Sequence, residues 1–403
     1  MAGNRTGALV AVVLAGGGAR GAYEAGALSI LLPVLEQRGE RPAVVIGTSA
    51  GALNASYLAA TAHLPASDLM AAGLGIWESI GWAEVVRPLV SSASLMRLGS
   101  YLGEAIGLPG VRLESLLDAA TVRDTVRALV DFNQLERNVK TGEVVVAGVV
   151  ATSALTSRSV VFHRGLESPV PDARRGIDYV ATRLRQEHVL ASAAIPVIFP
   201  AVHVERPRQA RGWYVDGGTR LNTPIKPALA FGAERVVVIA LNSLASGPPS
   251  LAGEERPDAL QGAGQVLLSL LEDQLAHDVQ TLAATNTLVS VRGGSNGDGK
   301  RQVPYIVVSP RTRTVIGEIA LRVVRKHYSG PLGLMRSPDL ALLARLVAGG
   351  ADRQHAELLS FLLFAPEFAH ALIELGQEDA RAWLEAQHDL DDLWQVGPVT
   401  PSE

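Results

Sequence analysis

Two short apolar runs near the start of the chain each end in a glycine-containing turn that leads into a helical stretch. Residues 8–14 are followed by AGGGARG, and residues 43–46 are followed by GTSAG. Neither run alternates between apolar and polar residues, which is typical of strands covered on both faces. A strand followed by a helix, repeated along the chain, predicts a parallel sheet with both turns at the same edge. We therefore expect an α/β fold with a mainly parallel central sheet flanked by helices.

The order of predicted elements divides the chain into two parts. Further strands are predicted at residues 143–152, 159–163, 212–215, 235–241 and 303–309, and helices at 21–38, 50–63, 177–192 and 265–288. After about residue 311 only helical patterns follow, so we expect a catalytic domain over residues 1–310 and a C-terminal helical extension over residues 311–403. In the extension, LLSFLLF at residues 358–364 is too continuous for a one-sided apolar stripe. It therefore packs on the catalytic domain or faces lipid, and packing is favoured.

Composition excludes several classes of function. Of 403 residues 48% are hydrophobic, the net charge is −4, and Lys and Arg are scattered, so we expect a globular chain without a nucleic-acid partner. The absence of cysteine removes disulfides, thiolate catalysis and cysteine-bound zinc. No run reaches the ~18 apolar residues of a membrane span. We interpret residues 8–14 as a buried strand and not as a secretion signal, and we expect a soluble, cytoplasmic protein.

The segment VVIGTSAGALNAS carries the strongest chemical signal. A short buried strand runs into G-x-S-x-G and then into a helix, which is the context of a nucleophile elbow. Such an elbow holds its serine at the tip of a tight, strained turn, so the neighbouring residues must be small. Gly47 and Gly51 meet this requirement on either side of Ser49. We predict that Ser49 is a catalytic nucleophile and not part of an ordinary turn.

The glycine loop AGGGARG allows two interpretations. Its glycines fit G-x-G-x-x-G between a strand and a helix, as in a dinucleotide-binding turn, but Glu40 precedes the second strand where a ribose-binding acid would end it. With an elbow at the same edge of the sheet, the loop amides face Ser49. There they can stabilise the oxyanion that forms when a serine attacks an ester carbonyl. We assign Gly16, Gly17 and Gly18 to an oxyanion hole and keep nucleotide binding as a remote alternative.

A serine nucleophile needs a base, and the sequence offers two kinds. None of the nine histidines has a marked local signature. Asp216, in GWYVDGGTRLNTP, directly follows an apolar strand and precedes two glycines. This places a carboxyl group at a strand end, although Asp-Gly-Gly is also an ordinary turn sequence. From the residues alone, a histidine triad and an aspartate partner both stay open.

Four motifs in order resemble the patatin family of lipid acyl hydrolases, which includes bacterial patatin-like phospholipases. They are AGGGARGAYEAGAL, GTSAGALNA, ASAAIPVIFP and DGG, and they cover about residues 8–224. The resemblance implies a three-layer patatin-like fold and a catalytic dyad of Ser49 and Asp216 without histidine. It also implies that the loop at residues 16–18 forms the oxyanion site together with Arg20, which either donates to an anion or holds the loop in shape.

The resemblance further implies hydrolysis of carboxylic esters in phospholipids, lysophospholipids or simple acyl esters, with peripheral membrane contact and no cofactor. One departure is Ala15, since family members often carry an acid directly before the three glycines. An acyltransferase using the same serine stays an alternative, although Thr48 stands where malonyl-transferase-like elbows carry histidine. We expect burial to raise the pKa of Asp216, and the apolar residues of 191–200 to line the acyl site or the core. No metal is expected, because Asp298 is the lone carboxylate of GGSNGDGK.

Overall fold

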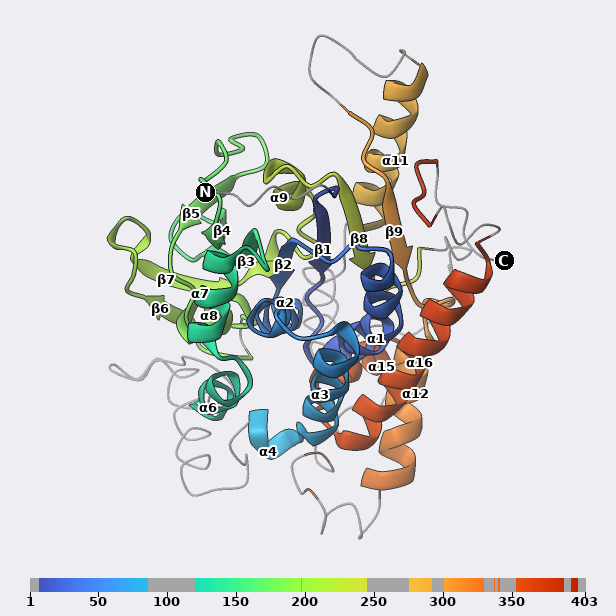
Figure 1. Ribbon diagram of the computed structural model, residues 1–403. Helices are drawn as coiled ribbons and strands as arrows, with labels where there is room; N and C mark the ends of the chain where they lie inside the picture. Colours follow the sequence, from blue (N-terminus) through green and yellow to red (C-terminus); the bar gives the residue numbers. More distant parts are fainter. Residues whose placement is uncertain are drawn as a thin grey trace, which may run out of the picture.

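The computed structural model places a nine-stranded sheet between layers of helices (Figure 1). It describes residues 7–85, 120–196, 198–244, 275–291, 301–329, 337, 340, 353–387 and 393–397. Within these residues the strands lie in the order β5-β4-β3-β2-β1-β8-β9, with β7 paired to β3 and β6 paired to β7. Their bounds are β1 Val10–Leu14, β2 Val44–Thr48, β3 Val146–Ser153, β4 Ser159–Gly165, β5 Ile177–Ala181, β6 Val202–Val204, β7 Gly212–Asp216, β8 Arg235–Ile239 and β9 Tyr305–Val308.

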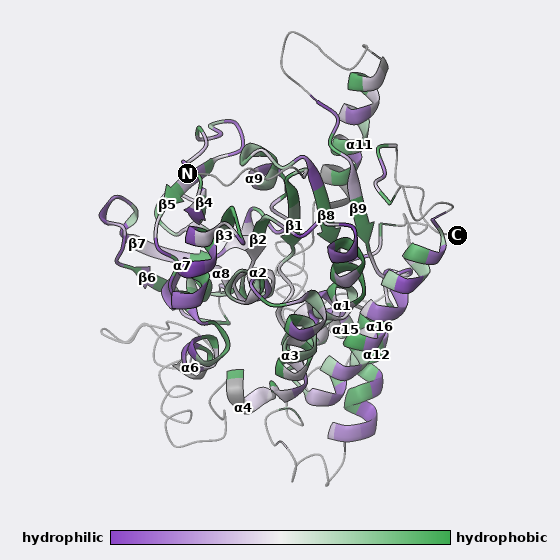
Figure 2. Cartoon of the chain, viewed as in Figure 1, coloured by the Kyte–Doolittle hydropathy of each residue, from purple (hydrophilic) through white to green (hydrophobic). Residues whose placement is uncertain are grey.

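The helices cover both faces of this sheet. The longer ones are α1 Gly21–Gln37, α2 Ala50–Thr61, α3 Ala66–Ser79, α6 Ala120–Leu129, α7 Phe132–Thr141, α11 Leu275–Val291, α12 Val315–Val323, α15 Arg353–Leu362 and α16 Pro366–Glu385. Shorter ones are α4 Trp82–Val85, α8 Gln186–Ser192 and α9 Ile225–Ala230, with single turns η1 Gly18–Arg20, η2 Arg208–Ala210, η3 Gly217–Thr219 and η4 Val324–Tyr328. In Figure 2 the central strands are green, and the outer helices carry both purple and green. This is expected for helices that bury one side against the sheet and expose the other.

Strand β1 shows why the layers form on both sides. Val10, Val12 and Leu14 join the apolar core that includes side chains of α1, α2, α15 and α16. Ala11 and Val13 point the other way, into the core formed with α9 and α11. Because successive side chains of a strand point to opposite faces, a strand that is apolar throughout requires cover on both. β1 pairs in parallel with both β2 and β8, at the centre of the sheet.

The mainly parallel α/β architecture predicted from the sequence is confirmed, with two strands missed. All seven predicted strands are present, but the prediction of a single helix over residues 177–192 is wrong: Ile177–Ala181 is strand β5, and only Gln186–Ser192 is helical. In β5, Ile177 and Tyr179 are buried while Asp178 and Val180 are partly exposed. This period of two fits an edge strand parallel to β4. The other missed strand, β6, has three residues; residues 265–274 of the predicted helix over 265–288 lie outside the described part.

The C-terminal helices pack closely on the helices next to the sheet. α16 lies along α1 (Figure 1), where the Tyr23 hydroxyl donates to Asp379 Oδ2 at 2.9 Å. In the run at residues 358–364, Leu359, Phe361 and Leu363 are buried in the protein, as the packing interpretation expected. Among the described residues no single helix is long and apolar enough to span a membrane. One bent pair, Ala356–Leu362 with Pro366–Glu385, meets that criterion by length and composition, with an angle of 104° between its helices.

The close crossing of α1 and α16 generates a prediction about stability. A Cβ at Gly26 would lie 2.3 Å from the Ile373 carbonyl oxygen, and one at Gly376 would lie 2.3 Å from that of Tyr23. We expect Gly26→Ala and Gly376→Ala each to lower the free energy of unfolding by about 1–3 kcal/mol, because backbone must move. Exposed Gly75, in α3, has open space at this position, so Gly75→Ala is a matched control that should gain about 0.5–1 kcal/mol. Urea unfolding measures all three; wild-type stability in Gly26→Ala and Gly376→Ala would contradict this packing.

Candidate active site

The site forms where β2 and β7 meet end to end on one edge of β3. β2 pairs with β3 as far as Thr48, which lies opposite Val150. At the next residue of β3, Ala151, the partner strand is β7, with Asp216 opposite. The other edge of β3 is occupied by β4 over the same stretch. The carboxyl ends of β2 and β7 therefore face each other. This register brings Ser49, one residue past β2, next to Asp216, the last residue of β7.

Ser49 has the strained backbone predicted for the tip of an elbow. Its φ is 54° and its ψ is −121°, in a region that non-glycine residues rarely adopt. The turn is so tight that a Cβ at Gly47 would lie 2.0 Å from the Gly51 carbonyl oxygen. A Cβ at Gly51 would lie 2.5 Å from the carbonyl oxygen of Leu14. The elbow glycines are thus required both by the turn itself and by its contact with β1.

Ser192, which the sequence analysis did not single out, holds this turn in place. Its side chain is fully buried at the end of α8. The Ser49 amide donates to Ser192 Oγ at 2.8 Å, and Ser192 Oγ donates in turn to the Val150 carbonyl oxygen. The strained residue is therefore tied to β3 through one hydroxyl group.

Asp216 is fully buried, and its two carboxyl oxygens differ. Oδ1 accepts a hydrogen bond from the Gly218 amide at 2.6 Å, whereas Oδ2 has no hydrogen-bond partner among the described residues. Burial raises the pKa of Asp216 to about 7, against the smaller lowering effects of the Ser49 hydroxyl and the Gly218 amide. The Ser49 hydroxyl thus lies close enough to affect the carboxyl group without completing a hydrogen bond to Oδ2. Looser contacts of this kind are common before substrate binds.

The glycine loop faces the site, but its amides are not equivalent. The Gly16 amide donates to the Asn222 side chain at 3.0 Å, and Asn222 Nδ2 donates back to the Gly16 carbonyl at 3.1 Å. This corrects the expectation that Gly16 supplies an oxyanion donor: it is a close-approach residue, because a Cβ there would lie 2.4 Å from Asn222 Oδ1. No hydrogen bond from the Gly17 or Gly18 amide to a described residue is seen. Gly18 has a φ of 57° and lines the pocket described below.

Arg20 points away from the pocket and into the C-terminal helix α15. Its Nε donates to Ser360 Oγ at 2.7 Å, and its guanidinium donates to the Glu357 carbonyl oxygen at 2.9 Å and pairs with the Glu357 carboxylate. The guanidinium also lies 3.9 Å from the centre of the Phe361 ring. Of the two roles considered for Arg20, these contacts correspond to holding the loop in shape and not to donating to a bound anion.

A second buried carboxyl group braces the strand end before the glycines. Glu24 accepts hydrogen bonds from the Ala15 amide at 2.7 Å and from Asn54 Nδ2 at 2.9 Å. Trp77 Nε1 donates to Asn54 Oδ1 at 2.9 Å and so extends this chain of contacts to the pocket wall. Burial raises the pKa of Glu24 to about 8. Where family members often have an acid before the glycines, Ala15 here is held by an acid from α1.

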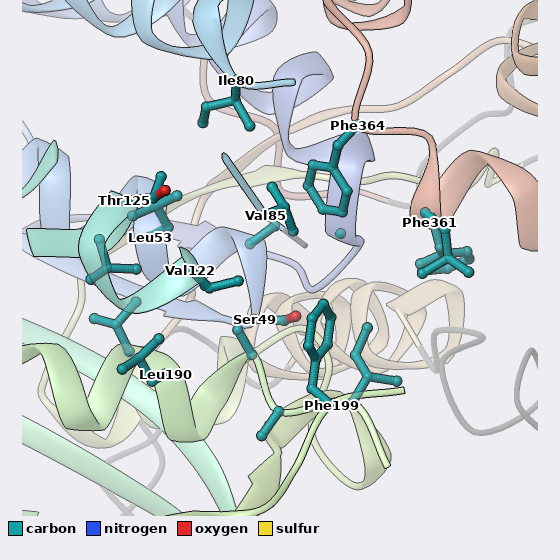
Figure 3. A pocket seen from close by; sticks show the side chains of 18 of the residues that line it. Ser49, Leu53, Ile80, Val85, Val122, Thr125, Leu190, Phe199, Phe361 and Phe364 are labelled. Atoms are coloured by element: carbon teal, nitrogen blue, oxygen red, sulfur yellow. The ribbon is translucent and has the colours of Figure 1, made fainter. Parts of the chain in front are cut away.

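An apolar pocket opens above Ser49 (Figure 3). The Ser49 hydroxyl points toward the side formed by Phe199, with Phe361 and Phe364 from the C-terminal part across the space. Ser49 and Thr125 supply the hydroxyl groups of its described lining. That lining consists of Gly18, Ser49, Ala50, Leu53, Trp77, Ile80, Val85, Val122, Thr125, Val126, Val189, Leu190, Ala193, Ala194, Ile195, Phe199, Pro200, Val202, Phe361, Leu362 and Phe364. Residues of the predicted stretch 191–200 thus form part of the wall, and the C-terminal side chains form another part that the sequence analysis did not anticipate.

Other candidate groups lie elsewhere or have structural partners. Among the described residues no histidine lines this pocket or hydrogen bonds Ser49 or Asp216; buried His188 instead accepts from the Arg185 amide. Glu40, weighed as a ribose-binding acid, pairs with Arg38 and Arg235 and accepts from Trp394 Nε1. Over the described ranges, no group of three or more acidic or histidine side chains is arranged to hold a metal ion.

Comparison with known proteins identifies the family. A model of the family described as patatin-like phospholipase matches residues 12–229, more than half of the 403 residues. The chain therefore belongs to the patatin-like phospholipase family, which supports lipid acyl hydrolase activity in general terms. No curated protein sequence matches it significantly. Among solved structures, a similar one is the crystal structure of VipD from Legionella pneumophila, at 15% identity, covering 92% of this chain and 67% of that chain with a TM-score of 0.33. This distant likeness carries no argument about activity.

The bridge through Ser192 generates a second prediction. Ser192→Ala removes the acceptor of the Ser49 amide and should lower stability by about 1–3 kcal/mol, because a buried donor loses its partner. It should also slow the reaction of Ser49 with a fluorophosphonate at least about tenfold, because the elbow loses its tie to β3. Ser56→Ala is a matched control, since Ser56 is buried in α2 with a hydroxyl that has no described partner. If both variants reacted at the wild-type rate, Ser192 would have no positioning role.

Proposed function

We propose that Ser49 and Asp216 form a catalytic dyad that hydrolyses carboxylic ester bonds of phospholipids, lysophospholipids or simple acyl esters. The observation that carries this proposal is the placement of a strained serine between a buried carboxyl group and an apolar pocket. A pKa of about 7 makes Asp216 suited to proton transfer near neutral pH, whereas an ordinary aspartate is too weak a base. This supports a dyad without histidine.

In the first half of the reaction, Ser49 Oγ attacks the carbonyl carbon of the ester while Asp216 Oδ2 takes its proton. The tetrahedral intermediate then collapses: the bond to the alcohol oxygen breaks, and protonated Asp216 gives its proton to the leaving alcohol. An acyl group remains on Ser49. In the second half, Asp216 removes a proton from water, the hydroxide attacks the acyl carbon, and the proton returns to Ser49 Oγ as the fatty acid leaves.

The negative charge of the tetrahedral intermediate needs donors that are in place beforehand. We assign this role to the amides of Gly17 and Gly18, since Gly16 is engaged by Asn222 and Arg20 by α15. Ser49 also directly precedes α2, a helix of 12 residues, whose N-terminal dipole favours negative charge at this point. Each such donor is worth on the order of 10² to 10³ in rate.

The pocket favours an acyl chain over a polar substrate. Its wall is almost entirely aliphatic and aromatic, so a hydrocarbon chain gains by leaving water while a charged group loses its hydration. Because Ser49 lies in this wall, we infer that the ester carbonyl binds at the pocket, with the alcohol part outside it. This supports a fatty-acyl ester as the substrate class.

The third prediction concerns the dyad. Ser49→Ala and Asp216→Asn should each lower kcat for a soluble nitrophenyl ester by at least about 10³-fold, because they remove the nucleophile and the base. Each of the nine histidines, changed singly to alanine, should leave most of the activity in every variant that folds. Circular dichroism and thermal unfolding verify the fold of each protein.

Two outcomes would contradict this assignment. One is activity above about a tenth of wild type in folded Ser49→Ala protein, because acyl transfer to another group would then be required. The other is a folded histidine variant as inactive as Ser49→Ala, which would point to a triad. Asn222→Ala is unsuitable as a control for these variants, because the Asn222 side chain accepts the hydrogen bond of the Gly16 amide in the glycine loop.

A further inference from the structure

The hairpin formed by β6 and β7 projects from the active site toward solvent. Its first residue, Val202, lines the pocket, and its last residue, Asp216, lies beside Ser49. Figure 1 shows β6 and β7 at the side of the molecule away from α16. At about 3.3 Å per residue, the connection between these strands begins about 10 Å from the pocket wall. Whatever this hairpin contacts is therefore held close to the pocket.

The hairpin and the turn beside it expose two large apolar side chains. Trp213 is 57% exposed, although its ring packs on His203 with 5.0 Å between ring centres. The Trp213 carbonyl oxygen accepts a hydrogen bond from the Ala154 amide, which places the turn after β3 alongside. In that turn Leu155 is 92% exposed. Tryptophan is the residue that most favours the boundary between lipid headgroups and acyl chains.

The same hairpin is basic on a chain that is acidic as a whole. Its connection, residues 205–211, carries three exposed arginines, Arg206, Arg208 and Arg211, against one exposed glutamate, Glu205. None of these arginines forms an ion pair with a described residue, although Glu187 lies near Arg206. The net charge of the protein is −4. A local positive charge of this kind attracts anionic headgroups.

We propose that Leu155, Arg206, Arg208, Arg211 and Trp213 form a docking surface for the interface of a bilayer that contains anionic phospholipids. The arginines bind headgroup phosphates and carboxylates, and Trp213 and Leu155 enter the headgroup boundary. Val202, at the base of the hairpin, lines the pocket, so a bilayer docked there lies close to the pocket and an acyl chain enters along the Phe199–Val202 wall. This inference rests on the proposed ester hydrolysis, which it supplies with a route for lipid.

A second basic cluster on α12 and η4 provides a matched control. Arg322, Arg325 and Lys326 are exposed and equal in number to the hairpin arginines. They lie at the opposite side of the molecule from β6 and β7 in Figure 1. None of them lines the pocket at Ser49. Neutralising either cluster changes the net charge equally, so a difference between the two variants reports position and not total charge.

The experiment compares vesicle binding by flotation for four proteins: wild type, the hairpin variant Arg206→Gln/Arg208→Gln/Arg211→Gln, Trp213→Ala, and the control Arg322→Gln/Arg325→Gln/Lys326→Gln. The vesicles are phosphatidylcholine with and without phosphatidylserine. We expect wild type to bind the anionic vesicles, less so at high salt, and the hairpin variant to bind about 100-fold more weakly, at about fivefold per arginine. Trp213→Ala should also bind more weakly, whereas the control should lose at most about fivefold.

Hydrolysis of a soluble nitrophenyl ester by the same proteins separates the two claims. We expect it to change by less than about twofold in the hairpin variant and the control, since neither changes the pocket. The docking surface is refuted if wild type does not bind anionic vesicles, if the hairpin variant binds as well as wild type, or if the control loses as much binding. Those results leave ester hydrolysis untouched. Conversely, hydrolysis that persists in Ser49→Ala would reject the catalytic proposal whatever the vesicles show.

Discussion

The shared edge of β3 is the constraint on which the rest of the site depends. β2 occupies this edge up to Val150, and β7 continues from Ala151, so the ends of the two strands are fixed at consecutive positions of β3. Ser49 and Asp216 therefore meet without a flexible loop between them. The carboxyl group of Asp216 is fully buried in this position, and the loss of water disfavours its ionised form. The same burial raises the pKa of Asp216 to about 7, in the range where an acid can both accept and return a proton.

The C-terminal helices are structurally inseparable from this arrangement. Arg20 connects the glycine loop to Glu357 and Ser360, and the backbone of α15 approaches Gly18 so closely that a Cβ would lie 2.2 Å from the Phe361 carbonyl oxygen. Phe361 also lines the pocket beside Ser49. The loop amides and the pocket wall thus depend on residues more than 300 positions away in the chain. The apolar run that suggested a lipid contact in the sequence packs in this interior and along the pocket wall. The exposed apolar residues near the site, Trp213 and Leu155, are on β7 and in the turn after β3.

The sequence predicted the parts of the site whose residues lie together in one short segment. The elbow at Ser49 and the strand end at Asp216 each depend on neighbouring glycines, whose spacing is visible locally. Ser192 and Asn222 carry no such signal, because their roles arise from contacts 143 and 206 residues away in sequence. Asn222 does lie within the quoted segment GWYVDGGTRLNTP, and its position six residues after Asp216 was the available hint.

One role that the sequence left open and one wrong element have related causes. Arg20 follows the glycines directly, so the sequence alone allowed it either to reach an anion or to hold the loop in shape, and its contacts with α15 correspond to the second role. Strand β5 was hidden because the apolar residues over 177–192 fit a helix as well as a strand followed by a short helix. Only the pairing with β4 distinguishes the strand from a helix, and the local sequence pattern contains no information about that pairing. Local periodicity therefore predicts the fully apolar strands well and misses a half-exposed edge strand such as β5.

The most direct test of the dyad is the rate at which a fluorophosphonate labels Ser49 as a function of pH, measured by mass spectrometry in wild type and in Asp216→Asn. Asp216 must be ionised to accept the serine proton, so the wild-type rate should fall about tenfold per pH unit below pH ~7 and level off above it. Asp216→Asn should label slowly and lack this step, whereas any step from Glu24, with its pKa of about 8, would remain. Labelling of another residue, or an unchanged step near pH 7 in Asp216→Asn, would contradict the account.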